Sequence, residues 1–175
     1  MKSESPGDWG HGKPAAHPSS ILVLGLGNPI LGDDGVGWRV AEEVRSALGE
    51  RSEGVEIDCA SLGGLSLMER MLGYSRVILI DAMETGENPV GHVSMFPLAA
   101  MRNPMVGHSS SAHDASLITA LRTAQTLGQV TPQRIDIVAI ETKQSYDFSQ
   151  ALTPPVEAAV AIATRKVLGA FSAEG

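Results

Sequence analysis

The chain has 175 residues, a length that suits one domain with a hydrophobic core of its own. Its 13 basic and 20 acidic residues give a net charge of −7, which disfavours binding to nucleic acid or to an anionic membrane surface. The single cysteine, Cys59, excludes an internal disulfide and a thiolate cluster for structural zinc. We therefore expect a cytoplasmic protein, and we expect it to be a monomer.

The first 20 residues differ in composition from the rest of the chain. Residues 1–20 are rich in Gly, Pro and Ser and lack the apolar segment of a secretion signal, which predicts a disordered tail. The folded domain is then expected over residues 21–172. No run in the sequence approaches the length of about 18 apolar residues that a membrane-spanning helix needs.

Hydrophobic patterns predict an alternation of strands and helices. Continuous apolar runs favour buried strands, and apolar residues at four-residue spacing favour amphipathic helices. The expected strands are 21–26, 54–60, 76–82, 91–97 and 134–141, and the expected helices are 36–48, 65–72, 111–128 and 153–171. This order predicts a single-domain α/β fold, with a mainly parallel, twisted five-stranded sheet and helices on both faces, as in phosphorylase/hydrolase-like folds.

Local signals mark the ends of the last two helices. Ser111 is expected to cap the helix that contains His113, and Gly128 is expected to stop that helix. Thr153 is expected to cap the final helix, with Pro154 in its first position.

Acidic and imidazole groups are expected at one edge of the sheet. In open α/β sheets, ligands bind outside the carboxyl ends of the strands. Asp33 and Asp34 follow the first strand, Asp81 closes the third, and His113 lies in the first turn of a helix that returns to the same edge. Two carboxylates and one imidazole suit a borderline divalent metal such as nickel, zinc, iron or manganese.

Each of these residues also has a structural interpretation. Either Asp33 or Asp34 could cap the helix that begins near Val36, because the helix dipole favours an acid there. A histidine at a helix start is often satisfied by an ordinary neighbour. Three further residues are alternatives to the main set: His92 at the start of a strand, His108 in the approach to a helix, and Glu141 at the end of the fifth strand, which could be a solvated loop acid.

The glycine-rich segment after the first strand does not fit a dinucleotide site. The motif G-x-G-x-x-G requires a third glycine, and Ile30 occupies that position after Gly25 and Gly27. An acidic pair lies where a pyrophosphate would bind. The sequence also lacks a G-x-S-x-G nucleophile motif.

Four separated motifs carry a resemblance to a known family. The segments ILVLGLGNPILGDDGVG, VILIDA, SSAHDASL and LTPPVEAAV occur in this order. Together they resemble the hydrogenase maturation endopeptidases, which trim the C-terminus of the large subunit of nickel-iron hydrogenases. The resemblance spans about residues 21–170.

The resemblance implies a set of site residues and a substrate. It assigns nickel binding to Asp34, Asp81 and His113, and it implies that Asp34 or Asp81 orients the attacking water. The nickel would arrive with the precursor of the hydrogenase large subunit, although other divalent ions could occupy the site in vitro. The loop DCASLGGLSL after the second strand departs from the more glycine-rich loop usual in the family, as does the tail.

Two other functions remain as alternatives. Peptidyl-tRNA hydrolases also open with a GLGNP-like segment, but they place a histidine soon after it, where this chain has Asp33 and Asp34. Their polyanionic substrate also favours a basic surface. The second alternative is a binding module that recognises nickel in a client protein, as a checkpoint or chaperone, without cutting it.

Overall fold

A computed structural model describes residues 21–49, 53–101, 109–143 and 148–172, except for the side chains of 109–116. The predicted disordered tail, residues 1–20, lies outside the described residues, as does His108. Among the described residues, no helix is long and apolar enough to cross a membrane.

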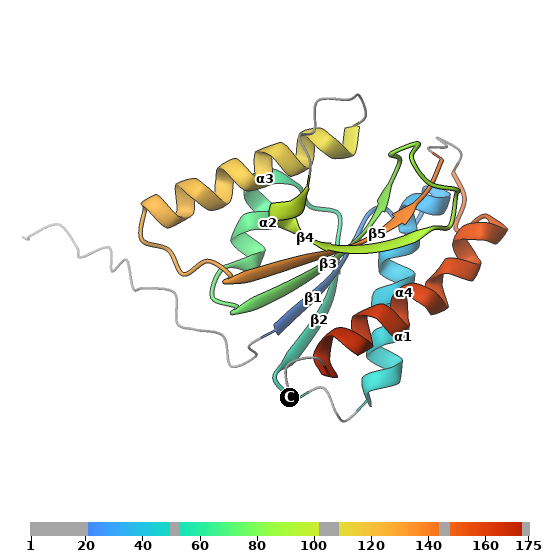
Figure 1. Ribbon diagram of the computed structural model, residues 1–175, viewed down its shortest axis with the longest axis horizontal. Helices are drawn as coiled ribbons and strands as arrows, with labels where there is room; N and C mark the ends of the chain where they lie inside the picture. The colour runs from blue at the N-terminus through green and yellow to red at the C-terminus, as the bar shows by residue number, and fades with distance from the viewer. Residues whose placement is uncertain (1–20, 50–52, 102–108, 144–147, 173–175) are drawn as a thin grey trace, which may run out of the picture.

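A five-stranded sheet forms the centre of the fold (Figure 1). The strands are β1 (Ile21–Leu26), β2 (Val55–Ala60), β3 (Arg76–Met83), β4 (Val93–Pro97) and β5 (Arg134–Glu141), and their order is β2-β1-β3-β5-β4. All neighbouring strands are parallel except β4, which pairs antiparallel with β5 at one edge. This confirms the mainly parallel sheet that the sequence predicts.

Helices cover both faces of the sheet, as predicted. The helices are α1 (Val36–Leu48), α2 (Gly64–Met71), α3 (Ser109–Thr126) and α4 (Pro154–Ser172). Figure 1 shows α1 and α4 on one face and α2 and α3 on the other. Alternation along each strand divides the core in the same way, because successive side chains point to opposite faces.

The central strand β3 illustrates this division. Val77 and Leu79 pack in the core beneath α2 and α3, whereas Ile78 and Ile80 pack beneath α1 and α4. All four side chains are buried, which explains why β3 is a continuous apolar run in the sequence.

The strand order places a topological switch point between β1 and β3. The chain passes from β1 to β2 on one side and then crosses to β3 on the other side of β1. In open α/β sheets, ligands bind outside the carboxyl ends of the strands at such a point. Gly25 pairs with Ile80 in the register, so Asp81 lies where β1 ends.

The ends of α3 agree only in part with the sequence prediction. The helix begins at Ser109, so Ser111 is inside it and the predicted cap is wrong; serines are readily accommodated in a first turn. Gly128 stops the helix as predicted. Its φ of 75° and the hydrogen bonds from Gly128 N to Gln125 O and from Gln129 N to Ala124 O form a Schellman motif.

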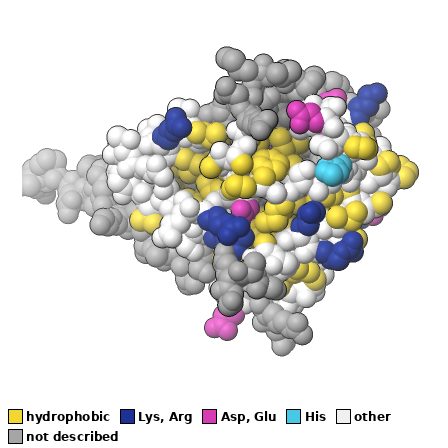
Figure 2. Space-filling view, viewed as in Figure 1, with side chains coloured by type: hydrophobic (Ala, Val, Ile, Leu, Met, Phe, Trp, Pro, Cys, Tyr) yellow, Lys and Arg dark blue, Asp and Glu magenta, His cyan; other side chains and the backbone are white. Residues whose placement is uncertain are grey.

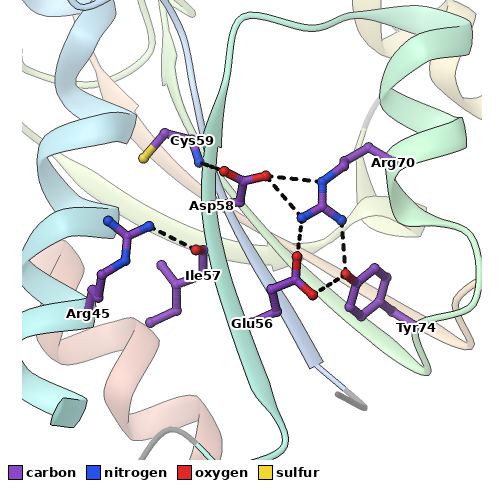
Figure 3. A network of polar contacts seen from close by, with 7 residues as sticks. All are labelled: Arg45, Glu56, Ile57, Asp58, Cys59, Arg70 and Tyr74. Atoms are coloured by element: carbon purple, nitrogen blue, oxygen red, sulfur yellow. Dashed lines mark hydrogen bonds and ion pairs between the residues drawn. The ribbon is translucent and has the colours of Figure 1, made fainter. Parts of the chain in front are cut away.

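A polar network joins the edge strand β2 to α2 (Figure 3). The Arg70 guanidinium donates to Asp58 and Glu56 and also to the Tyr74 hydroxyl, which in turn donates to Glu56 at 2.6 Å. Burial and the hydrogen bond to Glu56 raise the pKa of Tyr74, although Arg70 opposes this. The network joins α2 to β2.

Candidate active site

The turn from β1 into α1 is shaped by glycines that allow close backbone contacts. A Cβ atom at Gly25 would overlap the carbonyl oxygen of Gly37, and one at Gly37 would overlap the carbonyl oxygens of Leu26 and Ile80. The first turn of α1 therefore rests directly on the ends of β1 and β3. Sequence reasoning used these glycines only to exclude a dinucleotide site and missed this packing role.

Gly27 brings Asp34 back over the end of β1. Its φ of 116° is unfavourable for other residues, and a Cβ atom there would overlap the carbonyl oxygen of Asp34. The carboxylate of Asp34 accepts a hydrogen bond from Asn28 N at 2.6 Å. Asp34 is exposed, so this contact orients the carboxylate at the rim and leaves it accessible to a substrate.

Asp33 has a different environment from its neighbour. It is 8% exposed, and its carboxylate accepts hydrogen bonds from the backbone N–H of Thr153 at 2.6 Å and from the Thr153 hydroxyl at 2.8 Å. Asp33 thus ties the loop after β1 to the start of α4. Neither acid caps α1 with its side chain, because Gly35 is the capping residue and makes no such bond.

Asp81 is half-buried near the carboxyl end of β3. The strand continues to Met83, two residues further than an end at Asp81 would imply, because β3 and β5 stay paired as far as Met83 and Glu141. By alternation, Asp81 shares the face of Leu79, which is the face that α2 and α3 cover.

His113 lies in α3, the helix that covers the same face of the sheet as Asp81. It is the fifth residue of the helix, one turn before the buried Leu117, and not in the first turn as the sequence predicted. The side chain of His113 lies outside the described part of the chain. Among the described residues, no group of three or more His, Cys, Asp or Glu side chains is placed to hold a metal ion.

Two of the three predicted ligands lie near the carboxyl ends of neighbouring strands. Asp34 and Asp81 come from the adjoining ends of β1 and β3, at the switch point. A third neighbouring loop is linked to them, because the Ser61 hydroxyl donates to the carbonyl oxygen of Gly27 at 2.6 Å. The three-residue set with His113 stays a prediction.

Two of the alternative residues also lie at this rim. Glu141 is 6% exposed, so the interpretation as a solvated loop acid is wrong. Its carboxylate accepts hydrogen bonds from Thr85 and Gly86. These bonds satisfy the buried oxygens in place of water. His92 is exposed just before β4, and its carbonyl oxygen accepts a hydrogen bond from Glu141 N at 2.9 Å.

Comparison with known proteins identifies the family. Residues 20–170 match the family model described as hydrogenase maturation protease. The chain belongs to the hydrogenase maturation protease family. It is 30% identical over 159 residues to the hydrogenase 2 maturation protease of Escherichia coli strain K12, and the match covers 89% of this chain and 92% of that protein.

Other known proteins are also similar to this chain. The hydrogenase expression/formation protein HupD of Rhizobium leguminosarum is 28% identical over 140 residues, which cover 80% of this chain and 68% of HupD. Among solved structures, the hydrogenase-maturating endopeptidase HybD from E. coli superimposes with a TM-score of 0.70 at 27% identity, over 89% of this chain and 93% of that one.

A more distant structure has the same fold. The nickel-iron hydrogenase maturation protease HybD from Thermococcus kodakarensis has a TM-score of 0.63 at 24% identity and covers 85% of this chain and 97% of its own. Family membership and these neighbours establish that the chain is a peptidase of hydrogenase maturation.

Proposed function

We propose that this peptidase removes the C-terminal extension of a nickel-iron hydrogenase large-subunit precursor after nickel has been inserted. In this proposal, Asp34, Asp81 and His113 recognise the nickel that the precursor carries. The observation that supports the proposal is that the turn with Asp34 follows β1 and Asp81 lies near the end of the neighbouring strand β3, at the switch point. Ligand sites of open α/β sheets lie at such points.

Position 113 supports the inclusion of a histidine in this set. Residues four apart in a helix share a face, and Leu117 packs in the core on the face of the sheet that carries Asp81. In this proposal, residue 113 lies on the same face of α3 as Leu117, toward the sheet. An imidazole nitrogen with two carboxylate oxygens is a donor set that suits nickel.

The site residues would act on the peptide and on water. A divalent ion polarises a carbonyl group or lowers the pKa of a bound water. Asp34 is exposed and held in place by Asn28 N, so its free carboxylate oxygen could orient a water molecule and accept its proton. Asp81 is a second candidate for this role, and both acids are proposed as catalytic residues.

Two features argue against the tRNA alternative. The family match covers most of the chain, and Asp33 and Asp34 occupy the segment where a peptidyl-tRNA hydrolase needs its histidine. On the face seen in Figure 2, Lys and Arg side chains are separated by hydrophobic and uncharged groups and form no continuous basic surface. We propose that the protein acts as a cytoplasmic monomer.

The test uses purified protein with two forms of the precursor. The nickel-loaded precursor should lose the mass of its C-terminal extension, and the nickel-free precursor should stay intact because it lacks the ion that the site recognises. Mass spectrometry of both reactions measures this. A stable complex with a client of unchanged mass would instead identify a nickel checkpoint that does not cut.

A further inference from the structure

The carboxylate of Glu141 is buried at the rim of the site, although it is not one of the three proposed ligands. Its Oε1 atom accepts the backbone N–H groups of Thr85 and Gly86, both at 2.8 Å. Its Oε2 atom accepts the Thr85 hydroxyl at 2.6 Å. All three bonds reach the beginning of the segment 84–92, which joins β3 to β4.

The backbone of Glu141 holds the other end of this segment. Gly91 N donates to the Glu141 carbonyl oxygen at 2.7 Å, and Glu141 N donates to the His92 carbonyl oxygen at 2.9 Å. Gly91 also packs against the first turn of α4, because a Cβ atom there would overlap the carbonyl oxygen of Pro155. One residue of β5 therefore bonds to both ends of segment 84–92.

Segment 84–92 is directly connected to the candidate active site. It begins three residues after Asp81, and the intervening Met83 pairs with Glu141 in the sheet. The carbonyl oxygen of Met83 also accepts a hydrogen bond from Thr142 N at 2.8 Å. Only Ala82 and Met83 separate the start of this segment from Asp81 along the chain.

We propose that Glu141 is a positioning residue that fixes the start of segment 84–92 beside Asp81 and so keeps the rim in the geometry that the precursor needs. This inference rests on the proposed function. Glu141 acts through Thr85 and Gly86 and does not touch the substrate. Its role therefore depends on its hydrogen bonds to Thr85 and Gly86 and does not require a negative charge.

Two variants of Glu141 separate the effect of its hydrogen bonds from the effect of its negative charge. In Glu141→Gln, the amide oxygen can still accept both N–H groups, and the amide nitrogen can donate to the Thr85 hydroxyl oxygen. In Glu141→Ala, all three bonds from the side chain are lost while the backbone bonds to Gly91 and His92 remain. Thr85→Val and its matched control Thr85→Ser test the hydroxyl contact with a smaller perturbation.

The experiment measures cleavage of the nickel-loaded precursor and hydrogen exchange of the Thr85 and Gly86 amides. We expect Glu141→Ala to lower kcat/KM by about tenfold or more, since small misplacements of site groups are costly. Both amides should lose their protection in this variant, while amides of the β1 and β3 core stay protected. Glu141→Gln should restore both readouts, and Thr85→Val should lower kcat/KM more than Thr85→Ser.

Two results would overturn the inference. Normal cleavage by Glu141→Ala would show that segment 84–92 does not need the hydrogen bonds to the Glu141 side chain. If Glu141→Ala does not fold, equal cleavage rates for Thr85→Val and Thr85→Ser would lead to the same conclusion. A Glu141→Gln variant with protected amides but no cleavage would show that the charge itself reacts or binds. If the wild-type protein leaves the precursor intact, the proposed function is what fails.

Discussion

At the scale of single residues, the acids near the rim fall into two groups. Asp33 and Glu141 are buried, and each accepts hydrogen bonds from a distant segment. Asp34 is exposed and Asp81 is half-buried. A buried acid with bonded oxygens is suited to holding loops together, and we propose that the more accessible Asp34 and Asp81 are the acids that meet the substrate.

The proposed ligands Asp81 and His113 should be needed for activity but not for folding. We predict that Asp81→Asn and His113→Ala stay folded but process nickel-loaded precursor at least about a hundredfold more slowly, because loss of a ligand or of an acid–base group has effects of this size. Circular dichroism and cleavage rates measure the two properties. Wild-type rates in either variant would remove that residue from the site.

Asp33 should show the opposite behaviour. We predict that Asp33→Ala lowers the free energy of unfolding by about 1–3 kcal/mol, because both Thr153 donors lose their acceptor. Asp33→Asn, which keeps one acceptor oxygen, should cost less and process precursor almost normally. Urea denaturation gives these values. If Asp33→Asn abolishes processing while Asp34→Asn does not, the wrong acid of the pair has been assigned to the substrate.

Cys59 should have no part in the reaction. Burial raises the pKa of its thiol, with smaller contributions from Glu42 and Asp58 and an opposing one from Arg45. The fraction of thiolate at neutral pH is therefore lower than for a free cysteine, and alkylation by iodoacetamide should be slower than for a small thiol. We predict that Cys59→Ala cleaves at the wild-type rate. A large loss of activity in folded Cys59→Ala would contradict this.

At the scale of elements, the contact of α1 with β1 and β3 is the main constraint on the site. Gly37→Ala should destabilise the protein by several kcal/mol or prevent folding, because its Cβ atom would overlap two carbonyl oxygens. Gly169→Ala is the control, since a Cβ atom there meets nothing within 4 Å. It should stabilise α4 by about 0.5–1 kcal/mol in thermal or urea unfolding. Equal stability of the two variants would refute the packing account.

The elements themselves were largely predictable from sequence. The bounds of β1, α1 and β5 agree with the predicted ranges, because their apolar patterns are long and end at Gly or polar residues. The start of α3 was placed two residues late, since three consecutive serines give no sharp boundary signal. Propensity and periodicity are weakest at such ends.

The site was predictable only in outline. The order of strands and helices predicts that Asp34 and Asp81 follow neighbouring strand ends, and β1 and β3 are indeed adjacent, but their meeting in one site stays a prediction. The partners of Asp33 and Glu141 were not predictable, because they lie 120 and 56 residues away along the chain and depend on how loops meet. A glutamate at a strand end carries no sequence signal that tells a buried acceptor from a solvated acid.

At the scale of the whole molecule, loops from distant parts of the chain are joined at the carboxyl edge. Hydrogen bonds link Ser61 to Gly27, Asp33 to Thr153, and Glu141 to Thr85. These hydrogen bonds restrict the described loops of the rim relative to one another. Loops that are already restricted lose little conformational entropy when a large protein substrate binds.

The central claim is that Asp34, Asp81 and His113 meet around one cation. A crystal structure of the protein soaked with a divalent ion such as zinc tests this most directly. We predict one ion at the ends of β1 and β3, with an oxygen from each acid and an imidazole nitrogen at about 2.0–2.2 Å. An ion bound elsewhere, or a His113 side chain too far away to share the cation with both acids, would contradict it.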